Sequence, residues 1–204
     1  MRDPENISGV VEALPDFIGF IFYPESKRFG GFVPSPEILE SIPDSILKVG
    51  VFVDENQERV LEISRDWNLD VVQFHGHETP EYCSQIRNSG ILVFKAFAIG
   101  EQFDFESVKA YSGVCDYFLF DTKAQLPGGT GQKFNWQLLE NYKGDVPFFL
   151  SGGIGPEDLE AVRNFQHPML FGIDINSGFE IGPALKDVEK VKSFISAIRN
   201  LNNK

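Results

Sequence analysis

Two glycine-containing segments in the last third of the chain have the residue types of an anion-binding site. In each, a run of apolar residues is followed at once by small residues, Ser151-Gly152-Gly153 in the first and Asn176-Ser177-Gly178 in the second. Backbone N–H groups left bare at such a turn, with a helix beginning behind them, bind phosphate. We therefore expect the ligand to be a small phosphate ester.

Three other positions could do chemistry because each follows a short apolar run. Asp121 follows residues 117–120, and an acid at the carboxyl end of a barrel strand points into the mouth where chemistry takes place, although a carboxylate there could also cap a helix or lie at the surface. Arg28, with Lys27 beside it, could bind a carboxylate through two hydrogen bonds, or the two could be a solvated surface pair. His75 could be a catalyst, although a lone histidine is more often a hydrogen-bonded structural group, and its spacing to His77 and Glu78 is weak support for a metal site.

A glycine-rich stretch at residues 127–133 matches neither of two well-known nucleotide motifs. It lacks the Gly-Lys-Ser/Thr ending of a P-loop and the third glycine of a dinucleotide fingerprint. It could be a flexible loop or a flap over a site.

The arrangement of apolar runs predicts a parallel α/β sheet that holds these residues at one edge. Continuous runs of this kind are typical of parallel strands covered on both faces, and they alternate with amphipathic segments. We expect one domain spanning residues 1–204. The expected strands are 17–22, 47–53, 71–74, 91–97, 117–120, 147–150 and 169–173, and the expected helices are 4–13, 36–41, 55–67, 80–88, 105–111, 137–142, 156–164 and 187–201.

The strand count is one short of a closed (β/α)₈ barrel, in which a phosphate site follows strands 7 and 8. Seven strands are expected, and the first expected element is a helix. We therefore expect a barrel without its first strand, whose sheet edges near 17–22 and 169–173 are left unpaired.

The amino-acid composition limits the kinds of molecule that this protein is expected to bind. The formal net charge is -12, which disfavours nucleic acid and anionic membrane surfaces, and no apolar run is long enough to span a membrane. The sequence starts with polar and acidic residues, unlike a signal peptide, and has only two cysteines, Cys83 and Cys115. We expect a cytoplasmic protein, monomeric or homodimeric, with both thiols buried and inert.

Taken together, the segments resemble the phosphoribosylanthranilate isomerase family of tryptophan biosynthesis. The resemblance keeps the family's order and spacing over nearly the whole chain. Its pieces are residues 19–28, 50–53, 72–76, 120–123, 128–131 with Phe134 and Trp136, 150–153 and 174–180.

The resemblance implies a (β/α)₈ fold and an Amadori rearrangement of N-(5'-phosphoribosyl)anthranilate, with no metal and no organic cofactor. Such a reaction needs a general acid for the ring oxygen and a general base for the sugar C2 proton. By similarity, Asp121 is the acid and Arg28 binds the anthranilate carboxylate. The resemblance places Gly152, Gly153, Ser177 and Gly178 at the phosphate, Asp174 and Asn176 in the same motif, and His75 in the pocket wall.

The sequence departs from the family at its beginning. The family opens with a strand that ends in Lys-x-Cys-Gly, and that cysteine is the expected base. Here Met1-Arg2-Asp3-Pro4 resembles the residues that follow the motif, so we expect the strand and the base to be absent and activity to be impaired. Cys83 falls in an expected helix and Cys115 precedes its strand, so neither is a substitute.

Two other functions remain open. A non-catalytic, phosphate-binding barrel would keep the glycine turns and need no base. A neighbouring barrel enzyme is a poorer match, because indole-glycerol-phosphate synthase needs lysines at strand ends and ribulose-phosphate epimerase needs a metal cluster.

Overall fold

The fold is built on seven parallel strands that pair in chain order. The computed structural model describes residues 1–31, 38–39, 41–122 and 135–200. Each strand from β1 to β6 pairs in parallel with the next, so β1 and β7 are the outer strands of the described sheet. The strands are β1 (Phe17–Ile21), β2 (Leu47–Phe52), β3 (Val71–Phe74), β4 (Leu92–Ile99), β5 (Tyr117–Thr122), β6 (Phe148–Leu150) and β7 (Leu170–Ile173).

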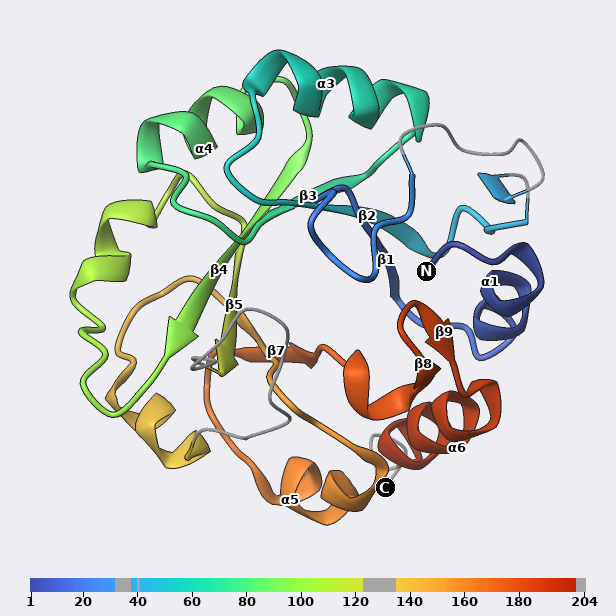
Figure 1. Cartoon of the computed structure of the whole chain (residues 1–204). Helices are drawn as coiled ribbons and strands as arrows, with labels where there is room; N and C mark the ends of the chain where they lie inside the picture. The colour runs from blue at the N-terminus through green and yellow to red at the C-terminus, as the bar shows by residue number, and fades with distance from the viewer. Residues whose placement is uncertain (32–37, 40, 123–134, 201–204) are drawn as a thin grey trace.

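The helices form an outer ring around the curled sheet (Figure 1). The connections of a parallel sheet return along its outside, which places every carboxyl end of a strand at the same edge. The α-helices are α1 (Pro4–Val11), α3 (Gln57–Asp66), α4 (Pro80–Arg87), α5 (Leu159–Asn164) and α6 (Val188–Arg199). Short 3₁₀ helices are η1 (Ser107–Tyr111), η2 (Trp136–Asn141), η3 (Pro156–Asp158) and η4 (Ser177–Phe179).

Polar caps explain where the longer helices begin. The side chains of Asp3, Thr79 and Asp187 accept hydrogen bonds from the first turns of α1, α4 and α6. Proline follows Asp3 and Thr79, at the position where a missing N–H costs nothing. These local signals are readable in the sequence, which is why the expected starts at residues 4 and 80 are confirmed.

The sheet separates two apolar layers. The larger lies between the strands and the helices and includes the fully buried side chains of Phe20, Phe74 and Phe120. The smaller lies on the other face, around Phe94 and Phe149. Because side chains alternate across a strand, both faces of a strand such as β6 are apolar, as the continuous runs predicted.

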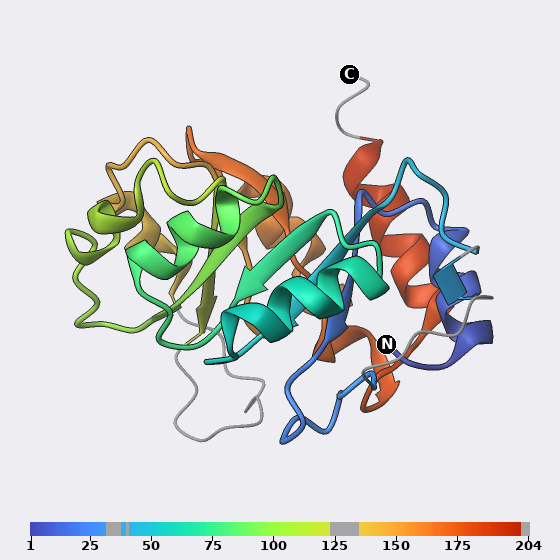
Figure 2. The ribbon, with the colours of Figure 1, turned by 90° about the horizontal axis from the view of Figure 1, so that it is seen from above.

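An antiparallel hairpin and two neighbouring helices lie between β7 and β1. The hairpin joins β8 (Glu180–Gly182) to β9 (Leu185–Lys186). Helices α1 and α6 pack against each other, and α1 also contacts β9 (Figures 1 and 2). The Asn6 side chain bonds the backbone of Lys186 twice, donating to O and accepting from N, each at 2.8 Å.

Several expected elements differ from the structure. The expected helices 105–111 and 137–142 are short 3₁₀ helices, and 156–164 divides into η3 and α5. The hairpin β8–β9 was not predicted, since two strands of three and two residues carry too few positions to show a pattern. Half of the expected helix 36–41 and all of the glycine-rich stretch 127–133 lie outside the described residues.

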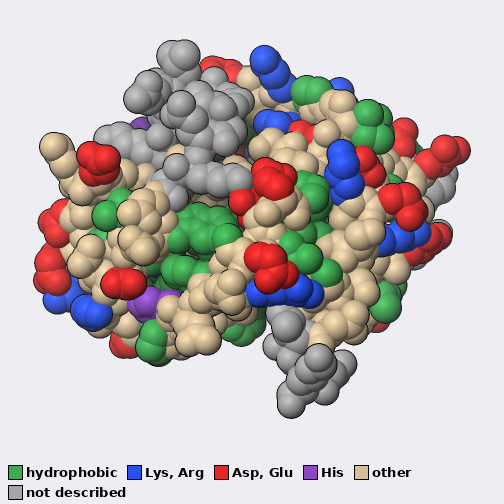
Figure 3. Space-filling view, turned by 90° about the horizontal axis from the view of Figure 1, so that it is seen from below, with side chains coloured by type: hydrophobic (Ala, Val, Ile, Leu, Met, Phe, Trp, Pro, Cys, Tyr) green, Lys and Arg blue, Asp and Glu red, His purple; other side chains and the backbone are tan. Residues whose placement is uncertain are grey.

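The surface mixes charges of both signs. In Figure 3, acidic and basic side chains lie close together, and hydrophobic side chains gather in one hollow of that face. None of the helices in the described part of the chain has the length and apolar character needed to cross a membrane.

Candidate active site

The expected site residues lie at the carboxyl-end edge of the sheet. His75 follows β3, Asp121 is the second-last residue of β5, Gly152 follows β6 and Asp174 follows β7. Because these strands are parallel, their ends meet at one edge, where the enzymes of this architecture place their chemistry. The structure therefore brings together side chains that are nearly one hundred residues apart in the sequence.

The Asp121 carboxylate is held at both oxygens. Oδ1 accepts the backbone N–H of Thr122 at 2.7 Å, and Oδ2 lies 3.3 Å from Nε2 of His75. Both side chains remain accessible, since 28% of Asp121 and 37% of His75 is exposed. A carboxyl group at this position has a fixed direction and can still touch a ligand.

Gln73 sets the tautomer of His75, and so decides whether the ring nitrogen that faces Asp121 carries the proton. Its amide Nε2, which can only donate, lies 3.3 Å from Nδ1 of His75. In the neutral form of His75, Nδ1 then accepts and the proton is on Nε2. The protonated Nε2 then lies 3.3 Å from Oδ2 of the Asp121 carboxylate.

A glycine turn lies directly against the acid. Gly152 and Gly153 have φ angles of 94° and 67°, in the left-handed region that favours glycine. A Cβ at Gly152 would collide with the Thr122 hydroxyl and would lie 2.8 Å from Oδ1 of Asp121. Neither glycine N–H makes a hydrogen bond to any residue that the structure describes. The turn thus presents, close to Asp121, two donors that have no partner among the described residues.

Asp174 joins the ends of β6 and β7. The Ser151 hydroxyl donates to Oδ2 of Asp174 at 2.8 Å, and the Asp174 N–H donates to Leu150 O at 2.9 Å. Burial raises the pKa of the Asp174 carboxyl, the nearby charge of Asp121 raises it further, and the Ser151 hydrogen bond opposes both. Two carboxyl groups in different environments therefore lie close together at the mouth of the sheet.

The second glycine turn is held by a lysine that the sequence analysis missed. Lys186 Nζ donates to the backbone O and the Oδ1 of Asn176, at 2.9 and 2.5 Å. At Gly178, a Cβ would lie 2.9 Å from Cα of Gly155 and would clash with Ile154 O, so only glycine fits where the two turns meet. Ser177 and Gly178 are exposed. The expected helix 187–201 is confirmed as α6, but it does not begin directly behind this turn, because a 3₁₀ turn and the hairpin β8–β9 come first.

Arg28 reaches the same region through Glu180. Its Nε and Nη2 donate to the Glu180 carboxylate at 2.7 to 3.0 Å, and Lys186 Nζ lies 3.2 Å from the same carboxylate. Burial alone would raise the pKa of Glu180, but the Arg28 hydrogen bonds and the charge of Lys186 hold it below its usual range. Burial lowers the pKa of Lys186, and Glu180 opposes that shift. Nothing in the local sequence marks Lys186, because its partners come from other elements.

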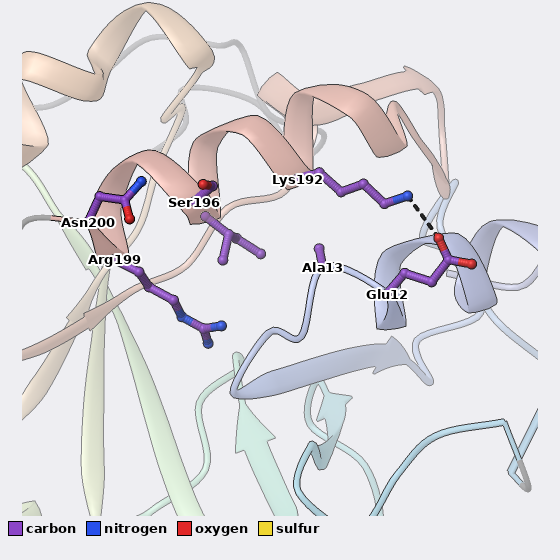
Figure 4. Close-up of a pocket in the computed structure, with 7 residues that line it drawn as sticks. Glu12, Ala13, Lys192, Ser196, Arg199 and Asn200 are labelled. Atoms are coloured by element: carbon purple, nitrogen blue, oxygen red, sulfur yellow. Dashed lines mark hydrogen bonds and ion pairs between the residues drawn. The ribbon is translucent and has the colours of Figure 1, made fainter.

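A cavity between α1 and α6 is lined by none of the site residues described above. It measures about 320 Å³ and is lined by residues of the outer helices (Figure 4). Lys192 is paired with Glu12 at 2.8 Å, and Arg199 is paired with Asp16 at 3.0 Å. Because both cations already have a carboxylate, this cavity is a poor anion site.

Comparison with known proteins decides the family. A family model described as N-(5'phosphoribosyl)anthranilate (PRA) isomerase matches residues 1–197. The chain belongs to this isomerase family. The isomerase of Parabacteroides distasonis is 48% identical over 199 residues, which cover 97% of this chain and 90% of that protein.

Solved structures of isomerases agree in fold. The Thermotoga maritima isomerase has a TM-score of 0.84 at 34% identity, covering 98% of this chain and 96% of that one. A solved isomerase in complex with reduced 1-(o-carboxyphenylamino)-1-deoxyribulose 5-phosphate has a TM-score of 0.81 at 32% identity, covering 98% and 95%. The resemblance stated from the sequence is confirmed at the level of family.

Proposed function

We propose that this protein catalyses the Amadori rearrangement of N-(5'-phosphoribosyl)anthranilate to 1-(2-carboxyphenylamino)-1-deoxyribulose 5-phosphate, a step of tryptophan biosynthesis in the cytoplasm. The observation that carries the proposal is the contact between an accessible carboxylate, Asp121, and a glycine turn with unpaired N–H groups at Gly152 and Gly153. A phosphorylated sugar held by the turn would lie within reach of the acid. The related isomerase solved with a reduced carboxyphenylamino-deoxyribulose phosphate supports the substrate class.

Asp121 is the general acid of this proposal. It donates a proton to the ring oxygen of the ribose while the bond from C1 to that oxygen breaks and the anilino nitrogen, which keeps its hydrogen, forms a protonated imine with C1. The carboxylate left behind is stabilised by the Thr122 N–H and by Nε2–H of His75. His75 therefore acts by holding Asp121 as well as by lining the pocket.

The two glycine turns are the proposed phosphate site. Gly152 and Gly153 offer bare N–H groups, and Ser177 and Gly178 extend the cradle from the end of β7. Lys186 fixes the second turn through the Asn176 carbonyl, and its positive charge adds to the attraction for phosphate. Asp174 orients the first turn through Ser151.

Arg28 is the proposed partner of the anthranilate carboxylate. Glu180 occupies the Nε side of the guanidinium and leaves Nη1 without a hydrogen bond to the described residues. A second carboxylate can approach that free end, because Arg has five donors in one plane. Glu180 thereby orients Arg28 without consuming all of its donors.

The general base is the part that these residues do not supply. Removal of the sugar C2 proton needs a base near the substrate, and the two cysteines of the sequence are buried away from this edge. We propose that the sheet is a (β/α)₈ barrel whose strand position between β1 and β7 is unfilled by the described residues. We also propose that the general base belongs to that position, so that residues 1–204 by themselves turn over slowly.

The test adds a short apolar strand ending in Lys-x-Cys-Gly ahead of Met1. The Met1 amino nitrogen lies 3.4 Å from Gly19 O on β1, so an added strand would run beside β1. We expect turnover to rise by about 10²–10⁴-fold, with a Cys→Ser version of the same extension as the matched control. Asp121→Asn in the extended protein should remove most of the gain.

Two outcomes would contradict this proposal in different ways. Full turnover by the chain without the extension would refute the missing base. An extended protein that binds inorganic phosphate or ribose 5-phosphate but never turns over would favour the non-catalytic, phosphate-binding function instead. The oligomeric state, monomer or homodimer, and the absence of nucleic-acid partners stay predictions.

A further inference from the structure

A buried ion pair lies beneath the turn that carries His75. Lys95 on β4 and Glu78, which follows β3, have side chains only 3% and 2% exposed, and Lys95 Nζ lies 3.4 Å from Oε2 of Glu78. Taking two charges out of water costs free energy that their attraction offsets only in part, so such a pair is weak evidence of added stability. The backbone groups that the two side chains bond indicate a different role.

The ammonium group of Lys95 bonds the chain on both sides of His75. Its Nζ donates to Phe74 O at 3.3 Å and to Gly76 O at 2.9 Å, and a third bond goes to Ala96 O at 3.0 Å. An ammonium group has three N–H donors, so these bonds use all of them. Strand β3 ends at Phe74, and the carbonyl of Gly76 therefore takes its partner from a side chain rather than from the sheet.

The carboxylate of Glu78 bonds the same turn and the turn beside it. Oε2 accepts the N–H of Gly76 at 3.0 Å, and Oε1 accepts the N–H of Asp54 at 2.9 Å. Asp54 belongs to the turn after β2. Both backbone groups of Gly76 are thus held by the pair, and one carboxylate joins the turns after β2 and β3. Because Lys95 belongs to β4, the pair connects three neighbouring strands near the edge that carries the site.

The backbone of residues 74–76 is bonded at every residue. The His75 N–H donates to Phe52 O at 2.9 Å, and the ion pair bonds the residue on either side of it. The imidazole itself is partly exposed, and its Nε2 lies 3.3 Å from Oδ2 of Asp121. Since an exposed ring is not held by packing alone, the fixed backbone beneath it is what carries His75 to Asp121.

We propose that Lys95 and Glu78 are positioning residues of this site, because the buried pair holds the turn that places His75 against Asp121. Neither side chain is exposed to a ligand, so the pair acts through His75. Its kinetic consequence rests on the proposed isomerase function, in which His75 stabilises the Asp121 carboxylate after proton transfer. The contact between His75 and Asp121 does not rest on that function and can be measured without the added strand.

The experiment measures by ¹⁵N NMR how the ring of His75 responds to Asp121→Asn. In the otherwise unsubstituted protein we expect the Nε2 signal to move, because an amide replaces the carboxylate beside it. The double variant Lys95→Met/Glu78→Gln removes both buried charges and leaves neither unpaired. In that background we expect Asp121→Asn to move the His75 signal little, with the ring of His167 as the internal reference.

A second buried lysine supplies the matched control. The Lys48 side chain is 7% exposed, and its Nζ lies 3.5 Å from Asp70 at the opposite edge of the sheet, where β2 and β3 begin. Lys48→Met/Asp70→Asn should leave the response of His75 intact. If the response is also intact in Lys95→Met/Glu78→Gln, that pair only stabilises the fold and the proposal is wrong.

The kinetics of the protein extended by a strand and cysteine give a second measurement. We expect Lys95→Met/Glu78→Gln to lower kcat by about 10–10²-fold and to change KM by less than about twofold, because the phosphate turns and Arg28 are untouched. An extended protein that never turns over would count against the isomerase function, and the NMR response would still decide the positioning role.

A further variant covers the case in which the double variant does not fold. Glu78→Asp keeps both buried charges but shortens the carboxylate by one carbon, so that it no longer reaches the two N–H groups together. We expect the same loss of the His75 response. A full response in folded Glu78→Asp would overturn the proposal.

Discussion

Arg28 and Glu180, separated by 152 positions in the sequence, form a two-point ion pair between the loop after β1 and the start of β8. The carboxylate side chain is 5% exposed and the guanidinium side chain 21%. A pair of this kind fixes the direction of the guanidinium as well as its position. The orientation of Arg28 toward the mouth of the sheet therefore depends on a residue from the far end of the chain.

We expect Glu180→Gln to destabilise the protein by about 2–3 kcal/mol, because it leaves Arg28 and Lys186 without a buried counter-charge. The pKa of Glu180 is lower in the folded protein than its usual value, so its contribution is present above that value and is lost as the pH falls through the folded pKa. Denaturation curves across the acid range measure this. Glu189→Gln on α6 is the matched control, since that side chain is 86% exposed. Equal losses in the two variants would contradict the role of the pair.

A methyl group at Gly152 should disturb the acid and the phosphate site together. The φ of 94° strains any side chain there, and the added Cβ has no room beside Thr122 and Asp121. We expect Gly152→Ala to weaken binding of ribose 5-phosphate at least about tenfold by calorimetry, corresponding to about 1.4 kcal/mol. Gly182→Ala is the control, because a Cβ at Gly182 meets nothing within 4 Å. Unchanged affinity in Gly152→Ala would place the phosphate elsewhere.

The tautomer of His75 offers a spectroscopic test of the Gln73 contact. In the neutral form we expect ¹⁵N NMR to report the proton on Nε2 of His75, and Gln73→Leu to populate both tautomers. His167 serves as an internal control, since the Met169 N–H donates to its Nδ1 at 3.0 Å and leaves its Nε2 to donate to Tyr142 O. A His75 signal that is the same in both proteins would show that Gln73 has no part in the choice.

The aromatic core allows a comparison of two phenylalanines. Phe120 is fully buried against Phe148 and Tyr142, with ring centroids 4.9 and 5.1 Å away. Phe171 on β7 is 52% exposed although it touches Tyr117. We expect Phe120→Ala to cost about 3–5 kcal/mol and Phe171→Ala about 1 kcal/mol in the free energy of unfolding, measured by urea denaturation. Similar costs would mean that Phe171 is buried in solution.

The strands could be predicted because each is a run of apolar residues on both faces, as in the exact match at residues 71–74. Positions next to a strand end, such as His75 and Asp121, could be predicted to share an edge because parallel strands fix that geometry. The turn after β6 could be predicted because it contains Gly152 and Gly153, and glycine is the residue type that favours the left-handed backbone found there.

The partners of these residues could not be predicted in the same way. Glu180 and Lys186 act through a two-stranded hairpin whose strands are too short to show a period. The ion pair between Arg87 and Asp116 depends on how α4 is set against the segment before β5, which only the packed structure defines. A side-chain pair between elements that are distant in the sequence cannot be predicted from the pattern of residues in either element.

The double hydrogen bond between Asn6 and the backbone of Lys186 spans 180 positions. During synthesis on the ribosome, α1 emerges well before its partners β9 and α6. Helix α1 must therefore wait with its apolar face uncovered until those partners have been made. Contacts of such long sequence separation also slow folding. The chain must lose the entropy of closing a very large loop before the contacts stabilise it.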